Sequence, residues 1–337
     1  MGCGDSKEAG PEPPSVKVLL LGAGCCGKTT FIKQMKLNFE GGFPEEELQE
    51  TSKQIQSNMV QRMAQVLVDE SVASTVSGEA QEHVDVVAQA AQAEHEFQEN
   101  NRFVEKVNVA LKYLVQNEAV AAYVDAHFYD APWDYDFFKK MDKIMSVDYK
   151  STPMEVLACR KATTGYHEYF FTIDKNVLLF VDVGGQRKER ATWVKAMENV
   201  TAVIYVGALT DYAIDLEEDT SRNRMDESLD LFERVYHSQK LKTVPTILFL
   251  NKTDLFKEMI HKQPLDSRYD TYVGGSDSES SLQFITNLFV ARTKTKPTEK
   301  QLMSFPVCST DPDNFMKVFS AIKTILLTSN LAAVGLL

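Results

Sequence analysis

The chain has 337 residues, 44% of them hydrophobic and 25% charged, with a formal net charge of −12 at pH 7. This length suggests about two domains with a large core. The acidic balance argues against nucleic-acid binding, which needs a basic face to neutralise phosphates. The five cysteines are scattered, which argues against a disulfide framework and favours a reducing compartment. With no membrane-spanning apolar run and no hydrophobic secretory core, we expect a cytoplasmic protein.

The first residues, "MGCGDS", fit the pattern for N-myristoylation at Gly2. Cys3 beside it is a candidate palmitoylation site. One acyl chain binds a membrane only marginally, whereas two chains anchor a protein to it. The alternative is an unmodified tail. We favour a short lipidated tail at residues 1–14, which the helix-breaking "GPEPP" separates from the fold.

The run "VKVLLL" predicts a buried parallel strand, and a helix is expected from about Lys28. Between them, "GAGCCGKT" at Gly22–Thr29 matches the phosphate-loop pattern G-x-x-x-x-G-K-[ST] in full. Its glycines let backbone N–H groups point at phosphates, and the helix N-terminus adds a partial positive charge. We expect Lys28 to reach the β- and γ-phosphates and Thr29 to offer its hydroxyl to Mg²⁺. The motif alone leaves ATPases, kinases and GTPases open.

Residues 44–152 are predicted to form an all-helical block. Gly78 is its only glycine and, after Pro44, Pro132 is its only proline. The Ala/Gln/Glu-rich run at residues 79–98 is interpreted as a solvated helix. Apolar residues recur at helical spacing at Leu48, Ile55, Met59, Met63 and Val66, and again at Phe103, Val107, Leu111 and Leu114.

After Pro153 the pattern alternates between strands and helices. The β-rich runs are "EYFFTI", "VLLFVD", "AVIYVG" and "TILFL", and helical stretches separate the last three. This alternation predicts a mostly parallel sheet covered on both faces. A last helix should follow "DPDNF", with Asp311 as N-cap and Pro312 at the first helical position. Its predicted apolar face comprises Phe315, Val318, Phe319, Ile322 and Leu326.

Two further segments suggest a guanine site. "NKTD" follows the strand "TILFL", and its Asp254 can accept hydrogen bonds from the N1–H and the exocyclic amine of guanine. Adenine lacks that donor pair, so an adenine base would leave the carboxylate unpaired. "CST" at Cys308–Thr310 could complete the pocket through a backbone N–H.

Residues around the next predicted strand suggest phosphate chemistry. In "VDVGGQR", Asp182 can hold Mg²⁺ through water, Gly185 can donate its N–H to a γ-phosphate, and Gln186 can orient an attacking water. In "CRKATTG", Thr163 is a candidate second hydroxyl ligand to Mg²⁺. Arg160 is a candidate for neutralising charge in the transition state.

With these segments in this order, the chain resembles the alpha subunit of a heterotrimeric G protein along its whole length. The helical block falls where that family inserts its helical domain, and a small GTPase has no such insert. The resemblance implies an α/β fold: a Ras-like P-loop GTPase domain with a mostly parallel six-stranded sheet at residues 15–37 and 157–337, and an inserted all-α helical domain at residues 38–156.

The resemblance also implies the function: a guanine-nucleotide-binding signal transducer that hydrolyses GTP to GDP and phosphate with Mg²⁺. Arg160 and Gln186 are then the catalytic pair. Thr29, Thr163 and, through water, Asp182 would hold the metal. The nucleotide would contact Gly24, Cys25, Cys26, Gly27, Lys28, Thr29, Thr30, Leu157, Arg160, Thr163, Asp182, Gly185, Asn251, Lys252, Asp254 and Ser309.

A switch follows from the γ-phosphate. Thr163 and Gly185 can contact it in GTP but not in GDP, so residues 160–165 and 185–193 should be ordered in one state only. The resemblance implies that Arg190 and Glu227 pair with the Gly185 region in the GTP form. The alternative interpretation is that both are exposed surface charges. Trp193 could anchor a partner at this switch surface.

The partners implied are a G protein-coupled receptor at the C-terminal helix, a GTPase-activating regulator of the RGS type, an effector at the second switch, and the cytoplasmic face of the plasma membrane. Coupling to a beta-gamma dimer stays open because fifteen residues precede Val16 and three of them are prolines. Two competing hypotheses are a non-hydrolysing, nucleotide-locked scaffold and a P-loop kinase. Gln186 and Arg160 argue against the first, and "NKTD" against the second.

Several positions depart from the family pattern. The family usually carries glutamate at Cys25 and serine at Cys26. Because Cys25 lacks a carboxylate to pair with Arg160, we expect faster nucleotide release. Both thiols lie near Lys28 and a helix N-terminus, which should favour thiolates when nucleotide is absent, whereas bound phosphate would oppose them. Between redox regulation and two inert small side chains, we favour the inert side chains. Ala158, Ala162 and Pro132-Trp133 should weaken contacts between the domains, and Val334 replaces a cysteine that a toxin modifies in some members.

Overall fold

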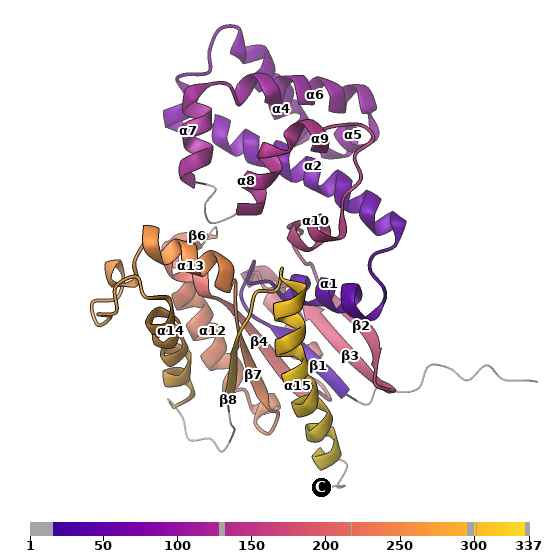
Figure 1. Ribbon diagram of the computed structural model, residues 1–337, viewed down its shortest axis with the longest axis vertical. Helices are drawn as coiled ribbons and strands as arrows, with labels where there is room; N and C mark the ends of the chain where they lie inside the picture. Colours follow the sequence, from indigo (N-terminus) through magenta and orange to yellow (C-terminus); the bar gives the residue numbers. More distant parts are fainter. Residues whose placement is uncertain (1–15, 128–131, 217, 295–299, 301, 334–337) are drawn as a thin grey trace, which may run out of the picture. The chain divides into compact units, whose positions relative to one another are not determined.

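The computed structural model of the protein describes residues 16–127, 132–216, 218–294, 300 and 302–333. The predicted acylation sites Gly2 and Cys3, and Val334, lie outside these residues. The chain forms two compact units, one at Gly42–Lys161 and the other made of the remaining described residues (Figure 1). The predicted domain limits at residues 38 and 156 stand near, but not at, the limits of the first unit.

The larger unit is built on a six-stranded sheet with the order β2-β3-β1-β4-β7-β8. β2 pairs with β3 in antiparallel fashion, and every other neighbouring pair is parallel. The mostly parallel six-stranded sheet predicted from the sequence is therefore confirmed. Its strands are β1 (Val16–Leu21), β2 (Tyr166–Ile173), β3 (Asn176–Val183), β4 (Ala202–Ala208), β7 (Thr246–Asn251) and β8 (Leu302–Pro306). The sequence did not predict the small antiparallel pair β5 (Asp215–Leu216) and β6 (Asp219–Asn223).

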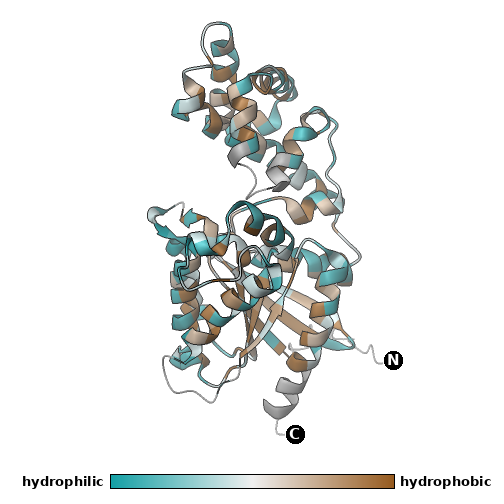
Figure 2. Ribbon diagram, turned by 60° about the vertical axis from the view of Figure 1, so that its left-hand side comes forward, coloured by the Kyte–Doolittle hydropathy of each residue, from teal (hydrophilic) through white to brown (hydrophobic). Residues whose placement is uncertain are grey.

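Helices cover both faces of this sheet because successive strand residues point to opposite sides. On one face the Phe31 ring lies 5.5 Å from Phe249 and 5.1 Å from Phe315. On the other face the Phe232 ring lies 5.1 Å from Tyr205 and 5.3 Å from Phe289. Figure 2 shows these strands as largely apolar between more polar helices.

The helices of this unit are α1 (Lys28–Phe39), α11 (Trp193–Ala196), α12 (Arg224–Tyr236), α13 (Thr253–Lys262), α14 (Ser278–Thr293) and α15 (Pro312–Ala333). Short 3₁₀ turns are η1 (Arg187–Thr192), η2 (Leu209–Ala213), η3 (Gln239–Leu241) and η4 (Leu265–Ser267). The predicted start of α15 is confirmed, since the Asp311 carboxylate accepts a hydrogen bond from the Asn314 N–H at 3.0 Å.

The unit at Gly42–Lys161 is helical throughout its described residues, as the sequence predicts. The run at residues 79–98 was expected to be a solvated helix, and this is wrong in part: it forms α4 and most of α5, and Val86, Val87, Ala90 and Phe97 on them are buried. The helices are α2 (Glu45–Leu67), α3 (Glu70–Ala73), α4 (Ala80–Gln92), α5 (Glu94–Glu99), α6 (Asn101–Leu114), α7 (Glu118–His127), α8 (Pro132–Lys139), α9 (Met141–Ile144) and α10 (Pro153–Ala158).

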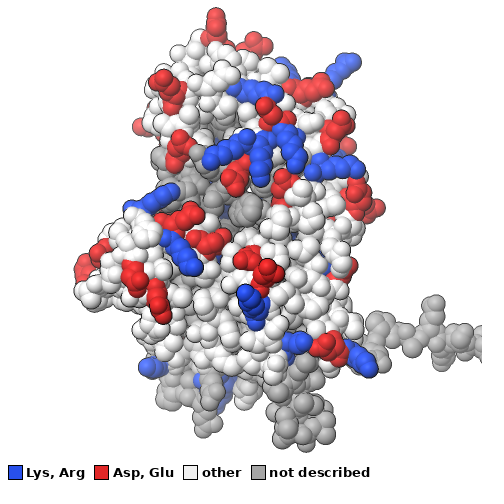
Figure 3. Space-filling view, in the orientation of Figure 1, with Lys and Arg blue, Asp and Glu red and all other residues white. Residues whose placement is uncertain are grey.

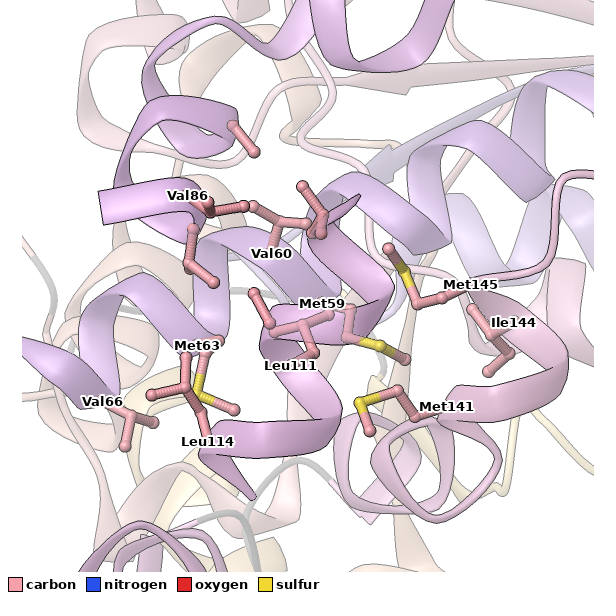
Figure 4. Close-up of a cluster of buried hydrophobic side chains, with 14 of the residues drawn as sticks. Met59, Val60, Met63, Val66, Val86, Leu111, Leu114, Met141, Ile144 and Met145 are labelled. Atoms are coloured by element: carbon pink, nitrogen blue, oxygen red, sulfur yellow. The ribbon is translucent and has the colours of Figure 1, made fainter. Parts of the chain in front are cut away.

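Methionines fill much of this second core. Met59, Met63, Met141 and Met145 are each no more than 6% exposed and belong to one cluster with Leu111 (Figure 4). Their unbranched thioether side chains adapt readily to irregular gaps in a core. The methionines are thus core residues, which is how the sequence interpretation treats them.

Charged side chains of both signs are interspersed over the face of the molecule drawn in Figure 3. None of the helices described is both long and apolar enough to cross a membrane.

Candidate functional site

The loop between β1 and α1 needs glycine at two positions. Gly22 and Gly27 have φ angles of 148° and 105°, in the region that favours glycine. A Cβ atom on Gly22 would lie 2.2 Å from the Val206 carbonyl oxygen, and one on Gly27 would lie 2.1 Å from the Asn251 amide nitrogen. The chain therefore curls closely around this loop only because these side chains are absent.

Lys28 lies inside the loop that precedes it. Its side chain is buried, and Nζ donates to the carbonyl oxygens of Gly22 at 3.0 Å and Ala23 at 2.9 Å. A Cβ atom on Gly185 would come within 2.4 Å of the same Nζ. The ammonium group thus stands between the loop and the backbone that follows β3, which is where the sequence predicts a γ-phosphate.

Three oxygen-bearing side chains from distant segments converge beside Lys28. The Thr29 hydroxyl donates to Asp182 Oδ2 at 2.8 Å and is hydrogen-bonded to the Thr163 hydroxyl at 2.6 Å. Asp182 is fully buried, and its Oδ1 atom has no hydrogen-bond partner among the described residues. Burial raises the pKa of Asp182, against the lowering effect of the Lys28 charge and the Thr29 hydroxyl.

This donor set fits a small hard cation. Mg²⁺ prefers oxygen ligands and usually keeps several waters, so two hydroxyls and one carboxylate suffice. The unpaired Oδ1 of Asp182 is the kind of buried acceptor that a bound cation with its waters would satisfy. Among the described residues there is no group of three or more His, Cys, Asp or Glu that could hold a metal ion.

Asn251 connects the phosphate loop to the "CST" segment. Its amide nitrogen donates to the Cys26 carbonyl oxygen at 2.9 Å, and its amide oxygen accepts from the Ser309 N–H at 3.0 Å. The next residue, Lys252, adopts a left-handed φ of 66° at the start of α13. Asp254 follows in the first turn of that helix and is exposed. The "NKTD" and "CST" segments are therefore attached to the loop by one buried amide.

The backbone after β3 is tied to α12 and α11. Arg190 donates from Nε to the Gly185 carbonyl oxygen at 3.2 Å and from Nη1 to Glu227. Trp193 donates its indole N–H to the Gly184 carbonyl oxygen at 2.8 Å. The Glu227 side chain is only 2% exposed and that of Arg190 17%, so the alternative interpretation of both as exposed surface charges is wrong.

The ion pairs of Glu227 decide its protonation state. Burial alone would raise the pKa of Glu227, but hydrogen bonds from Arg187 and Arg190 outweigh that effect and lower the pKa to about 2. The carboxylate is therefore charged throughout the physiological pH range.

Sequence reasoning missed three residues that support this site. Arg224 donates from Nη2 to the Gly24 carbonyl oxygen at 3.1 Å and forms an ion pair with the buried Asp211 at 3.2 Å. Glu189 accepts the Gly165 N–H at 2.7 Å. Arg187 pairs with Glu227 and Asp219. The residues lie in charged runs without diagnostic spacing, so no sequence signal pointed to their partners.

A family model described as G-protein alpha subunit matches residues 5–326. The chain belongs to this family. It is 35% identical to the guanine nucleotide-binding protein alpha-4 subunit of Dictyostelium discoideum, over 94% of this chain and 90% of that protein. It is 32% identical to the G(o) subunit alpha of Planorbella trivolvis, over 95% and 90% of the two chains, and 33% identical to a guanine nucleotide-binding protein subunit alpha of Emericella nidulans, over 96% and 91%.

Within this G-protein alpha fold, the two loop cysteines have different environments. Cys25 is exposed and has a φ of 60°, whereas Cys26 is fully buried with its Sγ 3.7 Å from Lys28 Nζ. Burial raises the pKa of the Cys26 thiol, and the Lys28 charge opposes this only in part. The effect of Lys28 therefore does not favour a thiolate at Cys26, because the lost solvation outweighs the nearby cation, and Cys26 fits the interpretation of an inert small side chain.

Leu157 and Arg160 belong to the helical unit at Gly42–Lys161. α10, which contains Leu157, begins with a capping box between Thr152 and Glu155. Arg160 follows the helix with an exposed side chain, and its carbonyl oxygen accepts a hydrogen bond from Asn58 Nδ2 at 2.8 Å. The contacts of Leu157 and Arg160 with a nucleotide stay a prediction.

Proposed function

We propose that this G-protein alpha subunit is a molecular switch that binds GTP and GDP and hydrolyses GTP to GDP and phosphate. The observation that carries the proposal is a chain of hydrogen bonds next to Lys28: the Thr163 hydroxyl is bonded to the Thr29 hydroxyl, which donates to the Asp182 carboxylate. The names of its relatives, as guanine nucleotide-binding proteins, support the choice of base. Asp254 also supports the choice of guanine, since a carboxylate can accept hydrogen bonds from both donor groups of that base.

Each part of the site has a task in this reaction. The N–H groups of the loop and Lys28 bind the phosphates, with Ser309 and Asp254 at the base. Thr29, Thr163 and, through water, Asp182 would hold Mg²⁺. Bound Mg²⁺ supplies positive charge that neutralises the phosphate oxygens. This arrangement relies on positioning and electrostatics and uses no covalent enzyme intermediate.

The catalytic roles fall to two residues. Gln186 orients the attacking water, and Arg160 neutralises charge that develops in the transition state. Gln186 follows Gly185 directly, so any backbone movement toward a γ-phosphate moves the glutamine with it. Nucleotide-dependent ordering of residues 160–165 and 185–193 would then couple turnover to shape.

The wider role follows from family membership. We propose acylation at Gly2 and Cys3, residence at the cytoplasmic face of the plasma membrane, activation by a G protein-coupled receptor, deactivation aided by an RGS-type regulator, and an effector at the switch surface of residues 185–193. Trp193 is only 4% exposed, so the expectation that its side chain anchors a partner is wrong for this conformation. We assign residues 15–37 and 157–337 as the nucleotide-binding GTPase domain and residues 38–156 as the inserted helical domain.

Single-turnover phosphate release from GTP-loaded protein tests the proposal. We expect Mg²⁺-dependent release from the native protein, and strongly slowed release from Gln186→Leu and Arg160→Ala with GTP affinity retained. Excess GTP, but not ATP, should displace a bound fluorescent guanine nucleotide. Tight GTP binding with no phosphate release would instead support the non-hydrolysing scaffold, and equal competition by ATP would contradict the guanine assignment.

A further inference from the structure

Glu227 of α12 receives three guanidinium groups on one buried carboxylate. Arg190 donates to Oε1, Arg187 donates to Oε1 at 3.3 Å and to Oε2 at 3.1 Å, and Arg222 Nε lies 2.9 Å from Oε2. The Glu227 side chain is 2% exposed, so it depends on these cations in place of water. Three positively charged groups thus surround a single negative charge. The three arginines do not all come from the same segment of the chain.

Arg187 and Arg190 belong to η1, directly after the Gly184-Gly185 pair. They lie in the segment that the proposed function expects to loosen when the γ-phosphate is absent. If that segment leaves, Glu227 loses two of its three partners. A buried carboxylate without partners has an unfavourable free energy. Losing the two arginines would therefore by itself oppose the release of the segment.

Arg222 belongs to the stationary side of this contact. It is the next-to-last residue of β6, two positions before α12 begins, and its Nη2 atom donates to Asp230, one turn beyond Glu227. Asp230 is held in turn by Arg292 of α14 at 3.0 Å. Arg222 therefore stays beside Glu227 whether or not η1 is in place.

Arg222 also borders an open cavity. It lines an open polar cavity of about 470 Å³ together with Asp230, Glu233, Arg234 and His237. Glu227 does not line this cavity, so Arg222 borders the cavity beside Asp230 while its Nε lies 2.9 Å from Glu227 Oε2.

We propose that Arg222 is a standing counter-ion for Glu227 that competes with the two switch arginines and makes their release less costly. The inference rests on the proposed nucleotide switch. It assigns to Arg222 a positioning role that lowers the preference for the ordered form of η1. Removing Arg222 should leave Glu227 dependent on Arg187 and Arg190 in both nucleotide states, so η1 should stay ordered longer with GDP.

Limited trypsin cleavage tests this, read as the peptides that end at Arg187, Lys188 and Arg190. In the native protein these cuts should be fast with GDP and slow with a non-hydrolysable GTP analogue. With GDP, Arg222→Met should be cut about threefold more slowly than the native protein, the size expected for one partly exposed ion pair. Arg222→Lys keeps a cation and should behave as the native protein does.

Arg268→Met is the matched control. It removes a different arginine that forms an ion pair with α12, at Asp226, without touching Glu227, and should leave cleavage unchanged. Arg222→Met cut as fast as the native protein, or an equal effect of Arg268→Met, would overturn this inference alone. Native protein that is cut equally with both nucleotides would overturn the proposed switch, and the inference with it.

Discussion

The indole N–H of Trp193 is bonded to the carbonyl oxygen of Gly184, at 2.8 Å, although the two lie nine residues apart. Gly184 precedes Gly185, where an added Cβ atom would collide with Lys28 Nζ. The bond from Trp193 therefore connects the phosphate loop region to α11. Trp193 is 4% exposed. Any backbone shift at Gly184 must therefore be accompanied by a change in the surroundings of this indole.

We expect tryptophan fluorescence to report nucleotide state. Mg²⁺ with a GTP analogue should change the emission relative to GDP, because the indole loses its bond or its burial when the Gly184-Gly185 backbone moves. The chain has two tryptophans, and Trp193→Phe should abolish the change whereas Trp133→Phe should retain it. A signal that survives Trp193→Phe would place the movement elsewhere.

Asp182→Asn should uncouple magnesium from nucleotide binding. The buried carboxylate accepts the Thr29 hydroxyl on one oxygen, and its other oxygen has no partner among the described residues. The amide keeps the shape but loses the charge, so Mg²⁺ should be needed at about 10–100-fold higher concentration, the range typical of residues that orient metal ligands.

The measurement is a Mg²⁺ titration of GTP-analogue affinity by fluorescence or calorimetry, with metal-free GDP affinity as the internal reference. GDP affinity without metal should change little. An unchanged Mg²⁺ dependence in Asp182→Asn would remove Asp182 from the metal site.

Asn251→Ala should loosen the nucleotide pocket and the fold together. The change removes the donor to the Cys26 carbonyl and the acceptor of the Ser309 N–H, and both partners lie in buried surroundings. Two lost buried hydrogen bonds cost about 2–4 kcal/mol of folding free energy. GDP and GTP affinity should fall by similar factors, because the change acts on the loop and the base segment and not on the γ-phosphate.

Gln56→Ala provides the comparison. Gln56 is also a buried amide that spans segments, donating to the Ile144 and Ser146 carbonyl oxygens at 2.7 and 3.2 Å in the helical unit. The Gln56→Ala variant should have a lower free energy of unfolding in denaturant, while its nucleotide affinity should stay near the native value. If both variants weaken nucleotide binding equally, the effect of Asn251 is general destabilisation.

Asn58→Ala should slow GTP hydrolysis without weakening GTP binding. Asn58 donates to the Arg160 carbonyl oxygen at 2.8 Å, and Gln54 donates to the Asn58 amide oxygen at 2.9 Å. One lost hydrogen bond of about 1 kcal/mol corresponds to roughly fivefold in rate if it acts through the position of Arg160.

A double-mutant cycle separates positioning from general damage. In an Arg160→Ala background, the Asn58 change should have no further effect on the single-turnover rate. Asn58→Asp keeps an acceptor for Gln54 but loses the donor, so it should match Asn58→Ala. Additive effects of the two changes would mean that Asn58 does not act through Arg160.

The sequence predicted most of this architecture because its signals are local. The "VKVLLL" run, the phosphate loop and the Asp311 cap each lie within a few residues, and β1, α1 and α15 follow them. Contacts such as those of Arg222 and Arg224 join residues by ion pairs across the fold, and no period or motif encodes them. The effect of Lys28 on the Cys26 thiol could not be weighed for a related reason: the sequence shows the nearby lysine but not the degree of burial.

That difference in burial leads to opposite chemical behaviour at adjacent positions. Cys25 is exposed and Cys26 is fully buried, with burial raising the pKa of the Cys26 thiol. Because the thiolate is the reactive form, a maleimide should label Cys25 and spare Cys26 in the folded protein. Mass spectrometry of the tryptic peptide that carries both residues measures this labelling and distinguishes it from labelling at Cys3.

Single variants make the labelling assignment decisive. Cys26→Ser should leave the labelling rate of this peptide unchanged, whereas Cys25→Ser should slow it by about tenfold or more, as buried thiols are inert. Both variants should label fully after unfolding in denaturant. Equal rates in the two folded variants would show that the loop opens often enough to expose Cys26, and the closed packing of Cys26 against Gly22 and Lys28 would then not describe the protein in solution.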